Sequence, residues 1–180
     1  MAKVHGIDIA ARTLETATER IPYDRLVLAL ESEPNDFEVT GAADNAFFLR
    51  WMDDAVPLRQ HILACLEVAM DEPDPEHRRR LLTFVIVGES PTGVEFASAL
   101  AELVHGPAMW DYSGIQRGES HIVLVGMTER VLLSMSKRLS VYAADRLARR
   151  RVEVHTGATV ESNSRSACCS RMTRRSPPIP

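Results

Sequence analysis

The sequence predicts an α/β fold, in which a parallel sheet carries helices and is preceded by a segment of short antiparallel strands. Three observations favour this architecture. Between residues 84 and 155, short apolar runs alternate with longer amphipathic stretches, the order expected of strands and helices in a parallel sheet. A loop with two glycines follows the first of these runs, as at a strand-to-helix turn. Before residue 50, apolar and polar residues alternate over short stretches, which is typical of half-exposed strands.

The elements before residue 81 are predicted from hydrophobic spacing. Alternation over residues 4–9 predicts a half-exposed strand, and the apolar run 26–30 predicts a buried one. The prolines of residues 71–75 end a helix predicted at 53–70, and the basic run 77–80 is expected to be a solvated helix face. The apolar side chains that predict the helix are Leu58, Ile62, Cys65, Leu66 and Ala69.

A series of alternating strands and helices follows. Strands are predicted at 84–87, 121–125 and 152–155, and helices at 92–104 and 131–150. Because a helix separates each strand from the next, the strands are expected to be parallel and to form one sheet with helices packed on it.

Composition divides the chain into four predicted segments. Residues 1–50 form a first segment with strands, residues 51–80 a helical connector, and residues 81–161 the main α/β domain. Residues 162–180 are rich in serine, arginine and proline and have no hydrophobic periodicity. We therefore expect a disordered tail, which trypsin should remove first.

Composition also limits the partners. The net charge of -4 gives no reason to expect nucleic acid as a partner. No apolar run approaches the roughly 20 residues that cross a bilayer, and no signal-peptide pattern is visible, so a cytoplasmic location is expected. The cysteines Cys65, Cys168 and Cys169 have no metal-ligand spacing with each other or with the histidines, so no metal site is predicted.

The candidate site is the loop in LTFVIVGESPTGVE, residues 82–95. Gly88 can make the tight turn after the strand, and Gly93 lets the next helix pack close to it. Pro91 suits a helix start because its missing N–H would be unpaired there. Such a loop directs backbone N–H groups toward a phosphate, but Ser90 stands where a second glycine would let the backbone approach a pyrophosphate.

Two other motifs are excluded for the same loop. A nucleophile elbow requires glycine two residues after the serine, where Thr92 stands. A P-loop requires lysine directly after the second glycine, where Val94 stands. On the motif alone, a dinucleotide site and a plain strand-to-helix turn both remain open.

Longer stretches resemble a known family. They include IPYDRLVLALES, AADNAFFLRWMDDAVPLRQHI, RRRLLTFVIVGESPTGVEFASALAEL, DYSGI, IVLV, YAADRLARR and VEVHTGATV. Over residues 4–161 the chain resembles the type II NADH dehydrogenases, which are single-chain NADH:quinone oxidoreductases. The resemblance implies a Rossmann-like NAD(H)-binding domain at 81–161 and a partial FAD-binding-domain segment at 1–50.

The resemblance also implies an activity and partners. In intact relatives NADH passes a hydride to FAD, and the flavin reduces a quinone at the membrane, with which the family associates peripherally. The family's FAD fingerprint and its membrane-associating region are not found in this sequence. We therefore expect a truncated and impaired member of the family that does not hold FAD alone. The alternative is a non-catalytic nucleotide-binding or interaction fragment.

Several departures from the family fall on functional positions. Leu30 and Glu31 stand where the backbone approaches the flavin nucleotide, and Glu89 and Ser90 replace two glycines of the loop. Gly126 stands where an acid hydrogen-bonds the adenine ribose. A carboxylate about 4 Å from a phosphate charge costs roughly 4 kcal/mol, so weak NAD(H) binding is predicted. Replacing Glu89 and Ser90 by glycine and Gly126 by glutamate is expected to strengthen it at least about tenfold.

Two further residues match the family. Glu95 matches an acid that reaches toward the nicotinamide side, and the alternative is a first-turn glutamate stabilised by the helix dipole. Arg130 matches an arginine after the second strand, for which a solvated surface role is expected rather than the alternative of a ligand contact. No catalytic residue is predicted. The predicted cofactor-binding residues are Gly88, Glu89, Ser90, Pro91, Thr92, Gly93, Glu95 and Gly126.

Overall fold

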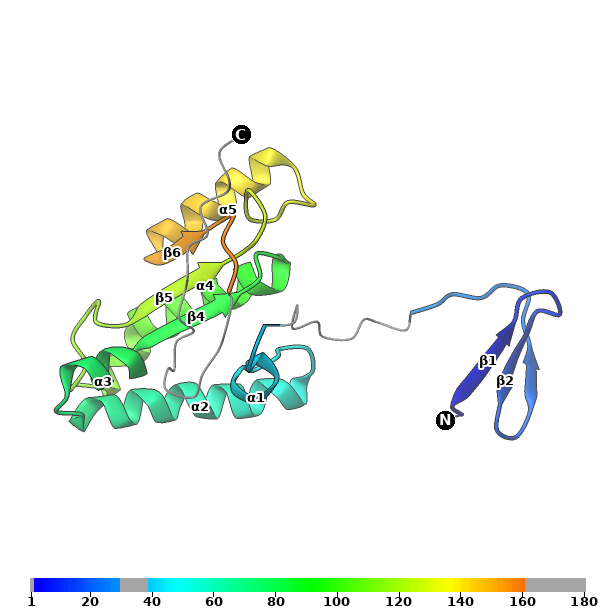
Figure 1. The fold of residues 1–180 in the computed structure, drawn as a ribbon, viewed down its shortest axis with the longest axis horizontal. Coiled ribbons are helices and arrows are strands. Elements are labelled where there is room, and N and C mark those ends of the chain that lie inside the picture. The colour runs from blue at the N-terminus through cyan, green and yellow to red at the C-terminus, as the bar shows by residue number, and fades with distance from the viewer. Residues whose placement is uncertain (1, 30–38, 161–180) are drawn as a thin grey trace. The chain divides into compact units, whose positions relative to one another are not determined.

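A computed structural model describes residues 2–29 and 39–160 (Figure 1). The chain divides into two compact units, Met1–Glu33 and Pro34–Pro180. The predicted disordered tail at 162–180, with Cys168 and Cys169, lies outside the described residues, as do Leu30 and Glu31. The boundaries expected at residues 50, 80 and 161 stay predictions.

The first unit is an antiparallel sheet of strands β1 (Val4–Asp8), β2 (Thr13–Thr16) and β3 (Arg20–Pro22), in that order. The strand predicted at 4–9 is confirmed. The buried strand predicted at 26–30 is wrong for residues 26–29, which form no strand and leave Val27 85% and Leu28 59% exposed. The reason is that a strand needs a neighbour for its backbone hydrogen bonds, and no strand in the described residues pairs with this run.

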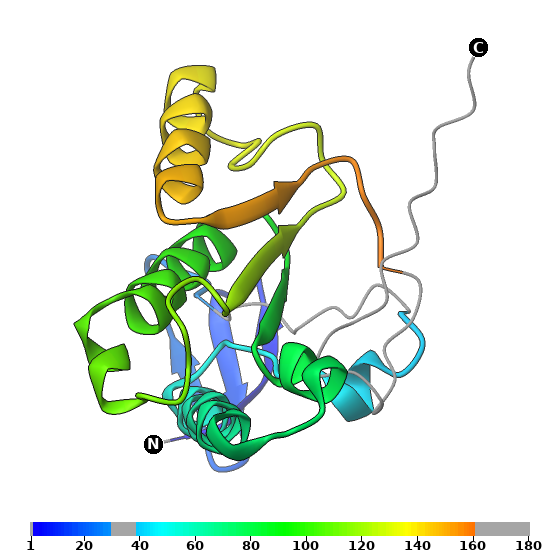
Figure 2. The ribbon, with the colours of Figure 1, turned by 90° about the vertical axis from the view of Figure 1, so that its left-hand side faces the viewer.

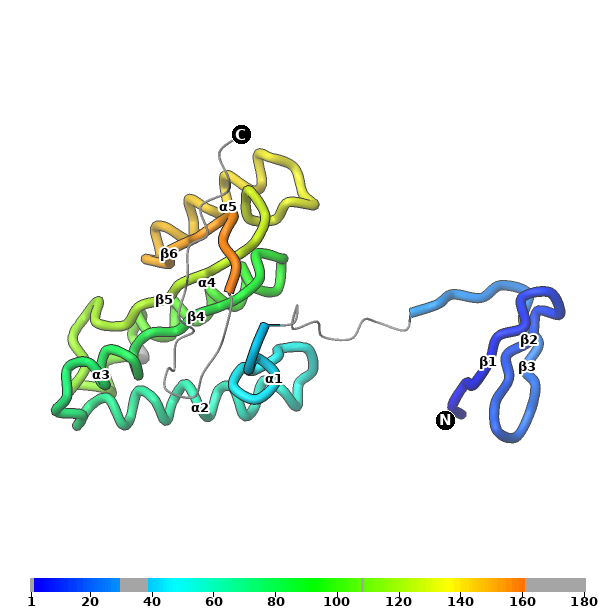
Figure 3. The backbone as a smooth tube through the Cα atoms, viewed as in Figure 1, coloured from blue at the N-terminus to red at the C-terminus, as the bar shows by residue number. Residues whose placement is uncertain are grey.

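The second unit is built on a parallel sheet, as predicted. Its strands are β4 (Thr83–Val87), β5 (His121–Val125) and β6 (Val152–His155), in the order β4-β5-β6. Ile122 lies opposite both Phe84 and Val152 in the register. The chain passes from β4 through α4 to β5 and from β5 through α5 to β6 (Figure 3). The sheet therefore consists of two strand–helix–strand units.

Helices pack against this sheet and build its main core. They are α1 (Ala42–Asn45), α2 (Met52–Asp71), α3 (Pro75–Leu81), α4 (Pro91–His105), the 3₁₀ helix η1 (Pro107–Asp111) and α5 (Lys137–Arg149). Alternate strand residues point to opposite faces, so Ile122 and Leu124 join the main core with α2, α4 and α5. Val123 and Val125 point to the other face and pack with Val160. Helices α4 and α5 lie on one side of the sheet (Figure 2).

Two predicted elements need correction. The helix predicted at 131–150 begins only at Lys137, because Ser136 caps it by accepting a hydrogen bond from the Leu139 N–H at 3.3 Å. Residues 131–135 form turns in which Val131 and Leu132 are buried. The apolar spacing of these residues resembles that of a helical turn, but they are apolar because the loop buries them.

The basic run at 77–80 is not simply a solvated face. Arg78 pairs with Glu119 at 2.5 Å, and its guanidinium also donates to the carbonyl of Ala69 at the end of α2 and to that of Gly114. The Arg78 side chain is only 19% exposed. Arg78 therefore links α2, α3 and the loop before β5, a role that the run of like charges did not indicate.

Candidate functional site

The candidate site lies at the edge of the sheet where the parallel strands end. The carboxyl ends of parallel strands meet at one edge, where α/β proteins bind ligands. Gly88 follows β4, and Gly126 follows β5. Gly88 has φ +116 and donates its N–H to the carbonyl of Val125 at 2.8 Å. The turn after β4 is therefore joined to the end of β5 and has a backbone conformation that favours glycine.

Gly93 explains why helix α4 lies so close to this turn. A Cβ on Gly93 would lie 1.8 Å from the Gly88 carbonyl oxygen, and the side chain of Leu124 is 3.6 Å away. Because the nearest atom belongs to the backbone, it cannot rotate aside. The close approach expected from the sequence is thus present, and only glycine permits it at this position.

The start of α4 leaves backbone donors without partners. Pro91 is the first helical residue, and the N-cap Ser90 makes no capping bond with its side chain. The first helical hydrogen bond runs from the Val94 N–H to the Ser90 carbonyl at 3.1 Å. The N–H groups of Thr92 and Gly93 therefore have no acceptor within the described chain. Such groups at a helix N-terminus suit a phosphate.

Glu89 does not extend freely from the loop. Its Oε1 accepts a hydrogen bond from the Thr128 N–H at 2.7 Å. Its Oε2 lies 1.7 Å from the position of a Cβ on Gly126, so the carboxylate lies over the end of β5. The sequence suggested only a charge near the phosphates. It contained no sign of the contact with Thr128, which lies 39 residues along the chain.

Arg130 stabilises the loop between β5 and α5. Its guanidinium donates to the carbonyl oxygens of Leu132, Leu133 and Met135 at 2.8–3.2 Å. These bonds satisfy carbonyls of the turn that precedes α5, so the main role of Arg130 in the structure is to hold its own loop. The sequence had suggested a solvated surface role or a ligand contact.

Glu95 is exposed on α4. Because the helix begins at Pro91, Glu95 is the fifth helical residue, and the first turn contains no acidic residue. The alternative of a first-turn glutamate stabilised by the helix dipole is therefore wrong, since that effect fades beyond the first turn. A role toward the nicotinamide stays a prediction.

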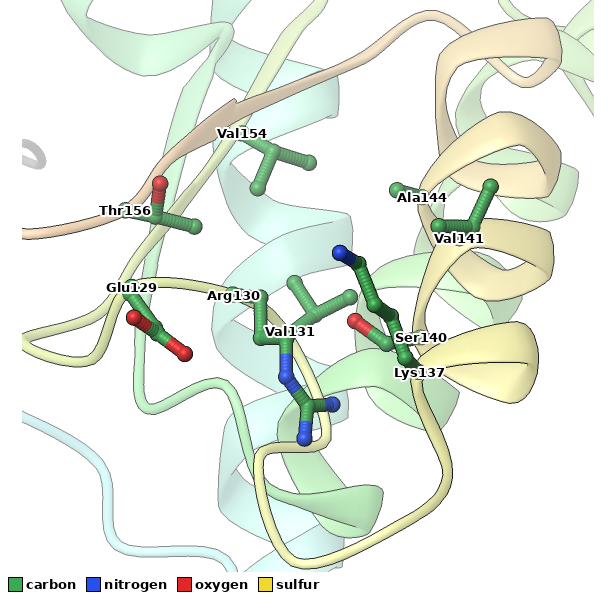
Figure 4. A pocket seen from close by; sticks show the side chains of 9 residues that line it. All are labelled: Glu129, Arg130, Val131, Lys137, Ser140, Val141, Ala144, Val154 and Thr156. Atoms are coloured by element: carbon green, nitrogen blue, oxygen red, sulfur yellow. The ribbon is translucent and has the colours of Figure 1, made fainter.

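A cavity of about 540 Å³ lies between the β5–α5 loop, helix α5 and strand β6 (Figure 4). Its lining includes Glu129, Arg130, Lys137, Ser140 and Thr156. The Lys137 amino group points into this space (Figure 4). Lys137 was not predicted as a site residue, because lysine at the first position of a helix carries no distinctive sequence pattern.

In the part of the chain that the structure describes, no group of three or more His, Cys, Asp or Glu side chains is arranged to hold a metal ion. No helix in residues 2–29 and 39–160 has the length and apolar character needed to cross a membrane. Cys65 lies on α2 and is buried in the main hydrophobic core, as its helical spacing predicted.

Comparisons with known proteins agree on one family. Residues 1–173 match the family model described as pyridine nucleotide-disulphide oxidoreductase. The chain is 34% identical over 170 residues to a type II NADH:quinone oxidoreductase of Mycobacterium tuberculosis, covering 92% of this chain and 37% of the relative. It is 33% identical to the mitochondrial external alternative NADH-ubiquinone oxidoreductase of Yarrowia lipolytica, covering 86% and 26%. This chain thus spans well under half the length of these relatives.

A solved structure supports the fold. NDH2 from Plasmodium falciparum in complex with NADH superposes with a TM-score of 0.72 at 21% identity, covering 85% of this chain and 32% of that one. At this identity the likeness shows the fold alone. It agrees with the predicted parallel sheet with helices.

Proposed function

This chain belongs to the pyridine nucleotide-disulphide oxidoreductase family, and we propose that its β4–α4–β5 unit binds NAD(H) as part of an NADH:quinone oxidoreductase. One observation carries the proposal. The turn at Gly88 and Gly93 brings the start of α4 against the edge of the parallel sheet, with two backbone N–H groups unpartnered. This arrangement suits the pyrophosphate of a dinucleotide. The names of the curated relatives add NADH as the reductant and quinone as the acceptor.

The described residues do not fit FAD. The glycine turn before α4 is the one place in them where a parallel strand leads through such a turn into a helix, and sheet β1-β2-β3 is antiparallel. In a complete enzyme of this kind, FAD would supply the redox chemistry between NADH and a quinone. The residues of this chain are proposed to bind and orient NADH, and we expect the chain alone to hold no FAD.

We expect NAD(H) to bind weakly. Ser90 places a side chain where the dinucleotide fingerprint has its second glycine, which lets the backbone approach the pyrophosphate. The Ser90 side chain makes no capping bond, so it leaves the backbone N–H groups at the start of α4 available. The binding free energy therefore rests mainly on the backbone donors of Thr92 and Gly93.

Titration and absorbance together test the proposed function. The purified chain should quench or shift NADH fluorescence saturably, show no absorbance near 450 nm from flavin, and fail to oxidise NADH with a quinone. Gly93→Ala is the matched variant, since it should abolish NADH binding by displacing α4 from the turn. A stoichiometric yellow flavin would contradict the expectation about FAD. Unsaturable NADH titration would contradict the binding site itself.

The second candidate is a non-catalytic nucleotide-binding or interaction fragment. The departures from the dinucleotide fingerprint at Ser90 and Gly126 favour it. The two candidates differ in one measurement, which is NADH oxidation after the chain is mixed with free FAD and a quinone. Turnover above that of FAD alone would contradict a non-catalytic fragment, whereas binding without turnover is expected of this chain alone under either candidate.

A further inference from the structure

A carboxylate from the β4–α4 loop fills the space above the end of β5. Gly126 is buried and directly follows β5. A Cβ built on Gly126 would lie 1.7 Å from Oε2 of Glu89 and 2.1 Å from its Cδ. These distances are far shorter than a van der Waals contact, so a side chain at position 126 and the Glu89 carboxyl group exclude each other. Glycine at 126 leaves the room that Glu89 occupies.

Hydrogen bonds hold Glu89 there at both ends. Oε1 accepts from the Thr128 N–H at 2.7 Å, and the Glu89 main-chain carbonyl accepts from the Leu132 N–H at 2.9 Å. Gly126 itself is fixed to the end of β6 by its N–H, which donates to the His155 carbonyl at 2.9 Å. Oε2 of Glu89 accepts no hydrogen bond from any described residue. One oxygen of a positioned carboxylate is therefore available to a ligand.

The place of this carboxylate corresponds to a known requirement of dinucleotide binding. In a βαβ unit of this kind, an acid after the glycine loop accepts hydrogen bonds from the adenosine ribose hydroxyls. Strand β5 is the second strand of the unit, and Gly126 after it has no side chain. We propose that Glu89, reaching the end of β5 from the loop after β4, supplies the ribose carboxylate and selects NAD(H) over NADP(H). This inference rests on the proposed function.

The charge of Glu89 sets the expected selectivity. NADP(H) carries a phosphate on the same ribose, and a carboxylate beside it would repel that phosphate. A cation could reverse the preference. The guanidinium of Arg130 is committed to three carbonyls of its loop, so Lys137 in the neighbouring cavity is the remaining candidate. Comparing the affinities of the chain for NADH and NADPH therefore shows whether Glu89 or Lys137 determines the preference.

A double-mutant cycle on the full chain tests the inference. NADH and NADPH are titrated against the wild type, Glu89→Gly, Gly126→Glu and the double variant Glu89→Gly/Gly126→Glu. Glu89→Gly should weaken NADH binding about tenfold, because bonds to a charged acceptor are lost, and should remove the preference over NADPH. Gly126→Glu alone should also weaken binding, since the two side chains collide. The double variant should return NADH affinity to within about threefold of the wild type, because one carboxylate again lies over β5.

Two controls keep the result interpretable. Glu67→Gln removes one negative charge from an exposed side chain of helix α2, and should change NADH affinity less than about twofold. The Thr128 amide resonance should shift upfield in Glu89→Gly, where the acceptor is lost, and less in Glu89→Gln, where a neutral acceptor remains. It should not move in Glu67→Gln. Thermal unfolding of each variant identifies any that fails to fold, and Glu89→Gln then replaces Glu89→Gly.

The outcomes also separate the inference from the proposed function. If Glu89→Gly or the double variant binds NADH about tenfold more tightly than the wild type, Glu89 repels the dinucleotide, and the inference is overturned while the site stands. Preference of the wild type for NADPH overturns it in favour of Lys137. If no variant binds either dinucleotide saturably, both the inference and the proposed function fail.

Discussion

At the scale of the residue, glycines decide what the site can hold. A Cβ would collide with a neighbouring atom at both Gly93 and Gly126, but the two obstacles differ in kind. At Gly93 the obstacle is a backbone carbonyl, whereas at Gly126 it is the end of a flexible side chain. Substitution at Gly93 must therefore move helix α4, and substitution at Gly126 needs only to move Glu89.

Gly93→Ala is predicted to destabilise the chain by about 3 kcal/mol, because overlap with the Gly88 carbonyl forces a backbone shift. This holds although alanine has the better helix propensity by about 1 kcal/mol. Chemical denaturation measures the free energy of unfolding. Ala99→Gly, at an exposed position of the same helix, is the matched control and should cost about 1 kcal/mol. A Gly93→Ala variant as stable as the wild type would show that α4 does not lie against the turn.

At the scale of the element, Arg78 adds polar bonds between α2, α3 and the loop before β5, which also share the main hydrophobic core. The bonds with Glu119 raise the pKa of Arg78 and lower the pKa of Glu119. Glu119 also accepts from the Gln116 N–H at 2.9 Å. The loop before β5 is thus fixed by one ion pair that also contacts the end of α2.

Arg78→Ala is predicted to lower the free energy of unfolding by about 1–3 kcal/mol at neutral pH, since several bonds to a charged group are lost. The pKa of Glu119 is lowered in the folded state, so this contribution is present above its unfolded pKa of about 4.3 and is lost as pH falls through the folded value. The difference between wild type and Glu119→Gln should therefore shrink below about pH 4. Arg79→Ala is the control, because Arg79 lies 3.7 Å from Glu76 with both side chains exposed, and should cost under about 0.5 kcal/mol.

The same elements show what the sequence could predict. Strands 121–125 and 152–155 were predicted to the residue, because apolar runs between polar loops mark buried strands. The start of α5 was misplaced, because Val131 and Leu132 are buried by a turn whose apolar spacing resembles a helix. The direction of the Glu89 side chain could not be predicted from the sequence, since it depends on the N–H of Thr128 and on the space over Gly126.

At the scale of the whole molecule, the two units differ in how they are stabilised. Both hydrophobic clusters consist of residues between Val39 and Val160. In the first unit, no residue from 2 to 29 is buried. Three short strands without a buried face are at best marginally stable. The stability of the second unit should therefore come from its own core.

Deletion of residues 1–33 is accordingly predicted to leave the second unit folded. The unfolding free energy should change by less than about 0.5 kcal/mol, as for changes remote from a core, and NADH affinity by less than about twofold, because Gly88, Gly93 and Glu89 all belong to the second unit. Thermal unfolding followed by circular dichroism and NADH titration measure the two quantities. Leu66→Ala in the full chain is the comparison, since Leu66 is fully buried and its truncation should cost about 2–5 kcal/mol. A deletion that destabilises the chain as much as Leu66→Ala would mean that the first unit contributes to the core, and the division of the molecule at residue 33 would be wrong.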